Sequence, residues 1–483
     1  MKSSNFIESF YSQLKHILRK EVPPVTLAIL IFPALVAMIT LIPSLRPGPY
    51  FLELVVVSYL TSFVFIEYPM RNNKLFSLHL SYRMTLYVLV LFNMILYVLA
   101  YNYLGLPGVP VFLGSGLIAL LFGPRLGAFS AVYQGIVMAY VAGMSIRSFA
   151  WLVAVGALTA FLLREVFYRS TVAKTALYTS LVNIGWYALN RIGVRLEPVF
   201  SEALIAALNP LICSVILIGL LPYVEITSRI YSNIGLTELG NLSHPLLKLL
   251  SMKAPGTYYH SVLMANIAEM AAESIGANPV LARTASYYHD VGKVKRPEYF
   301  SENQSGAENP HEKLSPWVSN LVLNEHVKYG VELARKYRLP LLVEDVVLQH
   351  HGTRPKLYFL HKARELDASV NDAEFRYPGV KPQFKESGII MLADSVEAAV
   401  RSIEKPRMSR IREVVEDIVN AVYNERELDE SGLTLKDLEL IIEAFTKTLS
   451  SMYHERVSYP DLEGKESTLI ASERNDNGNG SKR

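Results

Sequence analysis

Cysteine and charge are the two features that this sequence has least of. The 483 residues contain a single cysteine, Cys213, which lies within an apolar run. One cysteine excludes an intramolecular disulfide and a thiolate metal cluster. Charged residues make up 19% of the chain, against about 25% in typical soluble domains. The net charge is only +3, so the charge balance gives no reason to expect DNA as a partner.

Apolar sequence takes the place of charge, and its long runs are confined to the first half. A membrane-spanning helix needs about 20 mostly apolar residues, and eight runs reach or approach that length. The runs cover residues 23–43, 50–69, 84–104, 109–123, 127–144, 148–167, 175–191 and 202–225. They predict a polytopic helical membrane domain over residues 23–226. The short fourth and fifth runs, separated by "GPRL", alternatively form a re-entrant pair.

Basic residues outside these runs assign the two sides of the membrane. Cytoplasmic loops carry an excess of Lys and Arg. Eight crossings place the N-terminal segment 1–22, both basic loops and everything after about residue 227 in the cytoplasm. The first run lacks a small-residue cleavage site, so we expect an anchor in the bilayer and not a cleaved signal. The basic residues are Lys15, Arg19 and Lys20 in the N-terminal segment, Arg71, Lys74 and Arg83 in one loop, and Arg164, Arg169 and Lys174 in another.

The second half has the composition of a soluble domain built from helices. Apolar residues recur at three- and four-residue spacing, as in "HSVLMANIAEMAAESIG", which is typical of amphipathic helices. Thr434 and Asp437 have capping-box spacing before another such segment. No stretch alternates as a strand does, so the predicted fold class is all-α. We expect a linker helix over 227–250, a helical domain over 251–462 and a disordered polar tail over 463–483.

Histidines are concentrated in this helical domain. Nine of the 11 lie between residues 244 and 454, and His289 is followed directly by Asp290 in "SYYHDVGKVKRP". A single histidine is more often a hydrogen-bonded residue than a ligand, but a set of histidines and carboxylates on separate helices suits Mn, Fe or Zn. Adjacent helical residues point about 100° apart, so His289 and Asp290 could bind one ion only at a helix end, which Gly292 provides.

Several motifs together resemble one protein family. "HDVGK" is similar to the HDIG subgroup of HD-domain phosphohydrolases. "APGTYYHSVLMANIAE", "NPHEKLSP", "QHHGT", "FRYPGVKPQ" and "MLADSVEAAVRS" look like the seven-transmembrane receptors with an intracellular HD hydrolase, to which the PgpH-type cyclic di-AMP phosphodiesterases belong. The resemblance covers nearly all of residues 240–460. Only "PSLRPGPY" separates the first two apolar runs, so the large extracellular domain that family members insert there is missing.

The resemblance implies a site with two divalent transition-metal ions, most readily Mn or Fe, bridged by Asp290. It assigns His260, His289, Asp290 and Asp394 to the first ion, and Asp290, His326, His350 and His351 to the second. The catalytic residues expected are Asp290, Lys293 and His311. The substrate-binding residues expected are Lys293, Arg376 and Lys381, with Lys295, Arg296 and Lys385 as further members of a basic rim.

The function expected from the resemblance is hydrolysis of a cyclic dinucleotide, cyclic di-AMP to linear pApA, by an enzyme of the cell membrane with a cytoplasmic HD domain. The Gly-Tyr-Pro signature of cyclic di-GMP phosphodiesterases is absent. One alternative is a receptor whose HD domain binds nucleotide and relays a signal with little turnover. Another is an HD hydrolase acting on cyclic di-GMP or ppGpp. A homo-oligomer is compatible with each.

Overall fold

The computed structural model describes residues 51–142, 144–193, 199–304, 309–403 and 407–453. Within these ranges the chain is helical and contains no β-strand beyond one isolated bridge between Pro355 and Arg376. The all-α prediction is therefore confirmed. The expected N-terminal segment, the first apolar run and the expected tail lie outside the described residues.

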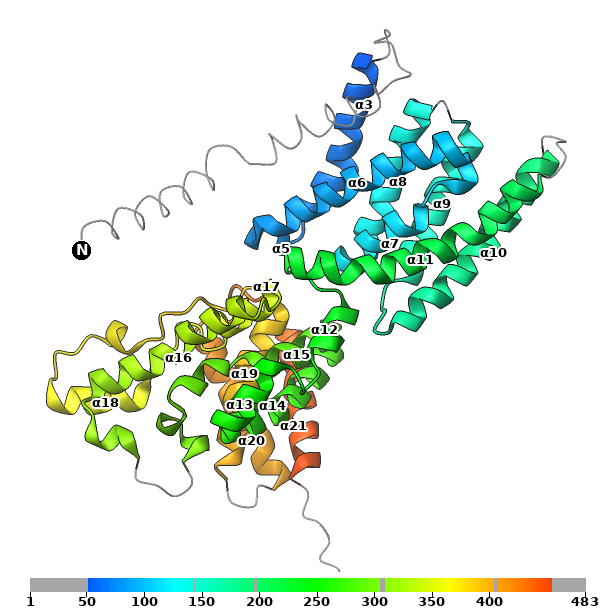
Figure 1. The fold of residues 1–483 in the computed structure, drawn as a ribbon. Coiled ribbons are helices and arrows are strands. Elements are labelled where there is room, and N and C mark those ends of the chain that lie inside the picture. The colour runs from blue at the N-terminus through cyan, green and yellow to red at the C-terminus, as the bar shows by residue number, and fades with distance from the viewer. Residues whose placement is uncertain (1–50, 143, 194–198, 305–308, 404–406, 454–483) are drawn as a thin grey trace, which may run out of the picture.

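Residues 51–228 form a helical bundle that we call the membrane half (Figure 1). Its elements are α3 (Phe51–Ser62), the π-helix η1 (Phe63–Glu67), α4 (Tyr68–Arg71), α5 (Leu75–Leu78), α6 (Leu80–Leu104), η2 (Leu106–Gly108), α7 (Val111–Phe122), α8 (Pro124–Ala142), α9 (Ile146–Leu162), α10 (Arg169–Gly193) and α11 (Phe200–Ser228). Among the described helices, α6 and α11 are long and apolar enough to cross a membrane.

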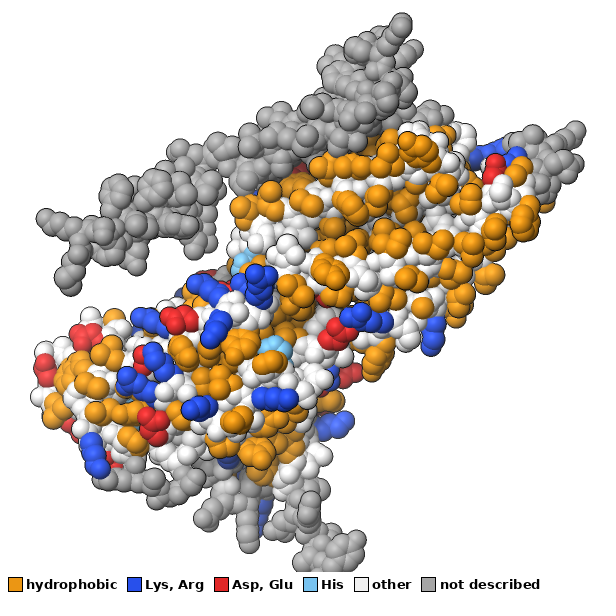
Figure 2. All heavy atoms as spheres, viewed as in Figure 1, with side chains coloured by type: hydrophobic (Ala, Val, Ile, Leu, Met, Phe, Trp, Pro, Cys, Tyr) orange, Lys and Arg blue, Asp and Glu red, His pale blue; other side chains and the backbone are white. Residues whose placement is uncertain are grey.

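The outer surface of the membrane half is apolar. On the face that Figure 2 shows, hydrophobic side chains predominate over the membrane half, whereas most of the Lys, Arg, Asp and Glu side chains lie on the other half of the molecule or at its edges. Val215 of α11, for example, is 72% exposed. A continuous exposed apolar surface is unfavourable in water and is explained by contact with lipid.

Residues 233–453, which we call the C-terminal half, pack around one large hydrophobic core. The α-helices are α12 (Asn233–Leu239), α13 (Pro245–Lys253), α14 (Pro255–Ser274), α15 (Pro279–Tyr288), α16 (Pro316–Lys336), α17 (Leu341–Gln349), α18 (Leu357–Leu366), α19 (Lys385–Arg401), α20 (Met408–Asn424) and α21 (Leu435–Met452). The 3₁₀ turns are η3 (Val291–Lys295), η4 (Pro297–Tyr299), η5 (Ser301–Asn303), η6 (Pro310–Lys313) and η7 (Asp372–Phe375). Helix α14 packs against α15, α19 and α21. The capping box expected at Thr434 and Asp437 starts α21.

Polar contacts join the two halves around α17. Arg229 ends α11 in the left-handed conformation (φ 59°). Its Nε donates to the carbonyl oxygen of Leu339 at 2.8 Å, and its Nη2 lies 2.7 Å from Oε2 of Glu344. The Leu341 amide donates back to the Arg229 carbonyl. The first turn of α17 is thus held by the end of α11.

Candidate metal centre

Seven predicted side chains from five parts of the C-terminal half meet in one place. Their ligand-type atoms fall into two groups, each with all atoms within 4.8 Å of one another. One group is His260 on α14, His289 at the end of α15 and Asp394 on α19; the other is Asp290 before η3, His326 on α16, and His350 and His351 at the end of α17.

Asp290 lies between the two groups and faces both. Its Oδ1 is 3.5 Å from Nε2 of His326 and 3.5 Å from Nε2 of His350. Its Oδ2 is 3.2 Å from Nε2 of His289. One carboxylate therefore presents a different oxygen to each set of histidines. This is the arrangement that a bridging ligand requires.

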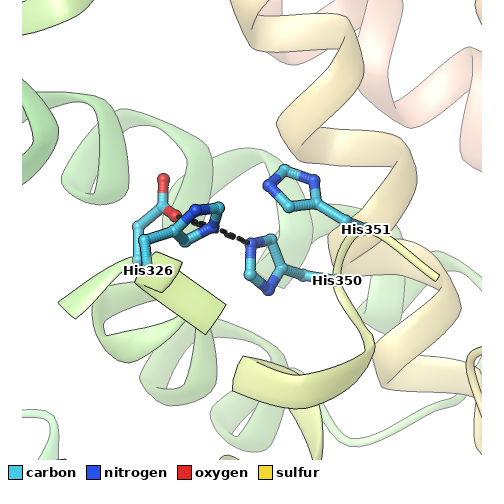
Figure 3. A group of neighbouring side chains, drawn as sticks. His326, His350 and His351 are labelled. Carbon is cyan, nitrogen blue, oxygen red and sulfur yellow. Dashed lines mark hydrogen bonds and ion pairs between the residues drawn. The ribbon is translucent and has the colours of Figure 1, made fainter. Parts of the chain in front are cut away.

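Asp394 and the histidine pair complete the two groups. Oδ1 of Asp394 is 3.0 Å from Nε2 of His260, and its Oδ2 is 3.8 Å from Nδ1 of His351. Figure 3 shows His326, His350 and His351 converging, with Nε2 of His326 and Nε2 of His350 3.4 Å apart. The three rings come from the middle of α16 and the C-terminal end of α17.

Backbone carbonyls fix the orientation of three of these rings. Nδ1 of His289 donates to the Ser286 carbonyl at 2.7 Å, and His326 and His350 use the carbonyls three residues before them in the same way, at 2.5 and 2.9 Å. A hydrogen bond from Nδ1 leaves the lone pair on Nε2. All three Nε2 atoms point at the site, so the local helix ends prepare neutral ligands.

His260 is oriented by a carboxylate instead. Its Nδ1 lies 2.5 Å from Oε2 of Glu397, which is 1% exposed. Arg401 approaches the same oxygen at 3.3 Å. A carboxylate behind a ligating histidine holds the ring and increases its basicity. Glu397 therefore supports the site without facing it.

Burial and neighbouring charges shift the pKa values of the site residues in different directions. Burial alone would raise the pKa of Asp290, but Lys293 and His289 hold it well below its usual range. Burial lowers the pKa of His326 to about 3. Burial also lowers that of His260, but its bonds to Asp394 and Glu397 outweigh this effect and raise it to about 9. Both the anionic bridge and a neutral His326 are thus available at neutral pH.

Some buried polar atoms of the site lack a hydrogen-bond partner among the described residues and are suited to bind a metal ion. His289 Nε2 and Asp290 Oδ1 are buried and accept no hydrogen bond from the described residues. Leaving such groups unpaired is unfavourable by about 1–3 kcal/mol each. A cation in each group would satisfy these two atoms, and imidazole with carboxylate is a donor set for divalent transition metals.

Gly292 explains how Asp290 comes so close to α16. A Cβ atom built on Gly292 would lie 1.8 Å from the His326 carbonyl oxygen and 2.7 Å from the Gly330 nitrogen. Only glycine permits this approach. The predicted helix end is found here, because α15 gives way at His289 to the 3₁₀ turn η3.

Lys293 also lies in the site. Its ammonium contacts Oδ2 of Asp290 at 2.7 Å and Oε1 of Glu302 at 2.7 Å. Glu302 in turn accepts from the Thr257 hydroxyl at 2.9 Å. An ammonium has three donors, so two carboxylates leave one donor for another group.

The other predicted residues lie apart from this cluster. His311 donates from Nε2 to the Tyr299 carbonyl at 3.0 Å and packs its ring on Phe359. Arg376 donates to the Thr353 carbonyl at 2.9 Å, and Lys381 donates to the Arg426 carbonyl at 2.7 Å. The remaining rim residues form ion pairs: Lys295 and Arg296 with Glu325, and Lys385 with Asp437.

Sequence reasoning missed Glu397, Glu302, Lys356 and Tyr377. Glu397 could have been found, because it is three residues after Asp394 and so lies on the same helix face. The Tyr377 ring stacks on His351 with centroids 4.2 Å apart, and Nζ of Lys356 lies 3.9 Å from the centroid of that ring. These contacts join distant segments and had no signal in the sequence.

Two family patterns match this chain. The pattern of the family described as "7TM receptor with intracellular HD hydrolase" matches residues 50–232, and that of the HD domain matches residues 257–399. The chain is thus similar to 7TM receptors with an intracellular HD hydrolase in its membrane half and to HD domains in its C-terminal half. It is accordingly a membrane protein with an HD domain, and metal dependence is general for HD domains.

Two curated relatives and one crystal structure are similar to parts of this chain. Cyclic-di-AMP phosphodiesterase PgpH of Bacillus subtilis is 36% identical over 74% of this chain and 52% of its own length. The Listeria monocytogenes PgpH is 37% identical over 63% of this chain and 43% of its own length. The crystal structure of the L. monocytogenes PgpH HD domain with cyclic-di-AMP is 44% identical, covers 44% of this chain and all of its own, and has a TM-score of 0.43. The chain thus spans about half the length of the curated relatives it matches.

Proposed function

We propose that this chain is a membrane-anchored, metal-dependent phosphodiesterase that hydrolyses cyclic di-AMP to linear pApA. The observation that supports it most is the placement of Asp290, whose two oxygens face two separate sets of histidines. A module that only bound nucleotide would not need two such sets around one buried carboxylate. The named substrate of the two PgpH relatives supports the choice of cyclic di-AMP.

The proposed cofactors are two divalent ions, Mn or Fe. His260, His289, Asp290 and Asp394 would hold one, and Asp290, His326, His350 and His351 the other. When bound, such ions supply an activated water and neutralise the charge of a phosphodiester. Sulfur ligands, which favour softer ions, are absent from this donor set.

The chain's own residues prepare the site for an anionic substrate. Hydrogen bonds from Nδ1 to backbone carbonyls orient His289, His326 and His350 so that each Nε2 faces the site. Lys293 donates its third N–H to a phosphate oxygen, while Asp290 and Glu302 hold its ammonium in place. Arg376 and Lys381 contribute positive charge at the rim. His311 holds the η6 turn against Tyr299 and is the proposed proton donor to the departing product oxygen.

The proposed topology has eight crossings, with the N-terminus and the C-terminal half in the cytoplasm. Lys74 and Arg169, which belong to the two basic loops, both contact the C-terminal half: Lys74 donates to the Glu430 carbonyl, and Arg169 pairs with Glu238 at 2.8 Å. These contacts support placing both loops on the side of the HD domain.

Turnover by the purified full chain tests this function. The protein in detergent is incubated with Mn²⁺ and with cyclic di-AMP, cyclic di-GMP or ppGpp, and the products are separated by ion-exchange chromatography. We expect pApA from cyclic di-AMP and at least a thousandfold loss of rate in Asp290→Asn. Asp417→Asn, an exposed carboxylate of α20, is the matched control and keeps the rate. Binding of cyclic di-AMP without any turnover would favour a signal relay instead.

A further inference from the structure

A small cavity lies within the membrane half, between α6, α9, α10 and α11. Its volume is about 220 Å³, and its polar and aromatic lining comes from Trp151, Asn183, Trp186, Tyr187, Arg191 and Glu202. It lies near the end of α10 and the start of α11, which Figure 1 shows pointing away from the C-terminal half. None of the residues that line this cavity belongs to the metal centre.

The cavity contains polar groups without partners. Asn183 is 4% exposed, and its Nδ2 reaches the Ala206 carbonyl at 3.4 Å. Its Oδ1 and the Nε1 of Trp186 are buried and make no hydrogen bond with the described residues. One is an acceptor and the other a donor. Tryptophan is common at membrane interfaces, but leaving both polar atoms unpaired is unfavourable unless a ligand pairs with them.

An ion pair adds one charge of each sign to the cavity wall. Arg191 donates to Oε2 of Glu202, and its Cζ lies 5.5 Å from the centroid of the Tyr187 ring. The Tyr187 hydroxyl donates to the Val199 carbonyl at 3.1 Å and accepts from the Val199 amide at 2.9 Å. The pair is therefore held against a fixed aromatic ring, and its net charge is zero.

We propose that this cavity binds a small zwitterion of the amino acid class with an apolar side chain. Its ammonium pairs with Glu202 and donates to Oδ1 of Asn183, and its carboxylate pairs with Arg191 and accepts from Nε1 of Trp186. Its side chain lies on the indole rings. A singly charged ligand would add an unbalanced charge to this neutral pair, which is unfavourable in a partly buried site. The volume lies below the range of about 300–1,000 Å³ of drug-sized sites, which suits a ligand of the size of an amino acid.

The site is connected to the metal centre through continuous structure. Glu202 lies in the first turn of α11, and Arg229 ends the same helix. Arg229 holds α17, which ends at His350 and His351. The binding proposal does not depend on the proposed hydrolysis, and it is tested without measuring activity.

Tryptophan fluorescence offers a direct test, because two of the three tryptophans line the cavity and the third, Trp317, lies in the C-terminal half. The full chain carrying Trp317→Phe is purified in detergent and titrated with each of the twenty common amino acids. We expect a saturable change in emission for one or more apolar amino acids, and at least tenfold weaker binding of their methyl esters and N-acetyl forms, which carry a single charge.

Variants of the wall decide whether the signal comes from the cavity. Glu202→Gln and Asn183→Leu are each expected to weaken binding at least tenfold, and Asn183→Leu keeps the ion pair in case Glu202→Gln does not fold. Tyr223→Phe, an exposed position of the same α11 helix, is the control and leaves affinity unchanged. No saturable change for any amino acid, equal binding of singly charged analogues, or unchanged affinity in a folded wall variant would each overturn the proposal.

Discussion

His79 of the membrane half and Asp345 of the C-terminal half are in direct contact, with His79 Nε2 2.6 Å from Asp345 Oδ2. Asp345 lies on α17, next to Glu344, which Arg229 holds at 2.7 Å. The same helix ends at His350 and His351. The nine-residue helix α17 therefore contacts the membrane half through Glu344 and Asp345. The two residues that follow it, His350 and His351, lie in the metal centre.

Asp345→Ala is expected to weaken metal binding without unfolding the protein. The substitution removes one of the two polar clamps on α17, so His350 and His351 are held less firmly. Changes in residues that orient ligands weaken metal affinity by about 10–100-fold, and we expect the lower end because Arg229 still holds the helix. Mn²⁺ titration calorimetry on the full chain measures this. Asp429→Ala, which breaks an exposed ion pair with Arg426, is the control, and equal affinity in both variants would contradict the role of the clamp.

Glu397→Gln should reduce metal affinity by about 10–100-fold. The amide has nearly the same shape but no longer supplies the negative charge behind His260. Metal content after gel filtration, measured by plasma emission spectroscopy, gives the result. Glu443→Gln, on the exposed face of α21, provides the comparison, and full metal content in Glu397→Gln would show that His260 is held by other contacts.

Gly292→Ala is expected to destabilise the C-terminal half severely. The new methyl group would collide with the His326 carbonyl at 1.8 Å, and η3 would have to move away from α16. Overpacking of this kind costs about 1–3 kcal/mol or more. Thermal unfolding followed by circular dichroism should show the loss. Gly276→Ala removes a glycine with positive φ in open space, so it separates backbone strain from collision, and a smaller effect at Gly292 than at Gly276 would refute the packing argument.

Metal uptake should release a proton at neutral pH. In the metal-free protein the pKa of His260 is raised to about 9, so His260 is protonated at pH 7 and must lose that proton to bind an ion through Nε2. His326, with its pKa near 3, has none to lose. Apparent affinity therefore rises with pH and levels off above about pH 9, by up to about tenfold per unit. Calorimetry in buffers of different ionisation enthalpy counts the proton, and no release at pH 7 would contradict the protonation of His260.

The same group makes a pH-dependent contribution to folding. Since its folded-state pKa is raised above the usual value of 6.5, its stabilising effect on the metal-free protein is complete below about pH 6.5 and is lost as pH rises through 9. Metal-free protein should therefore lose stability over the range in which metal affinity increases. Glu397→Gln removes part of this dependence.

The ligands of the metal centre were predicted from the family resemblance that short sequence motifs carry. The ligand-type residues occur in short motifs, and their local geometry depends on neighbours within three or four residues. His289, for instance, points its Nε2 inward because Nδ1 reaches the Ser286 carbonyl at the end of its own helix. The seven apolar runs within the described residues also correspond to helices, since hydropathy and helical spacing are local properties.

The surroundings of several side chains depend on tertiary packing and could not be predicted from the spacing of residues in the sequence. His311 carries the same imidazole as His326, yet it packs beside Phe359 because η6 and α18 meet there. Lys293 is held between Asp290 and Glu302 because η5, which packs on α14, places Glu302 beside it. The cavity beside Trp186 exists because α9, α10 and α11 converge. Such contacts join residues far apart in the chain, and their geometry follows from how whole helices fill space, which no short stretch of sequence specifies.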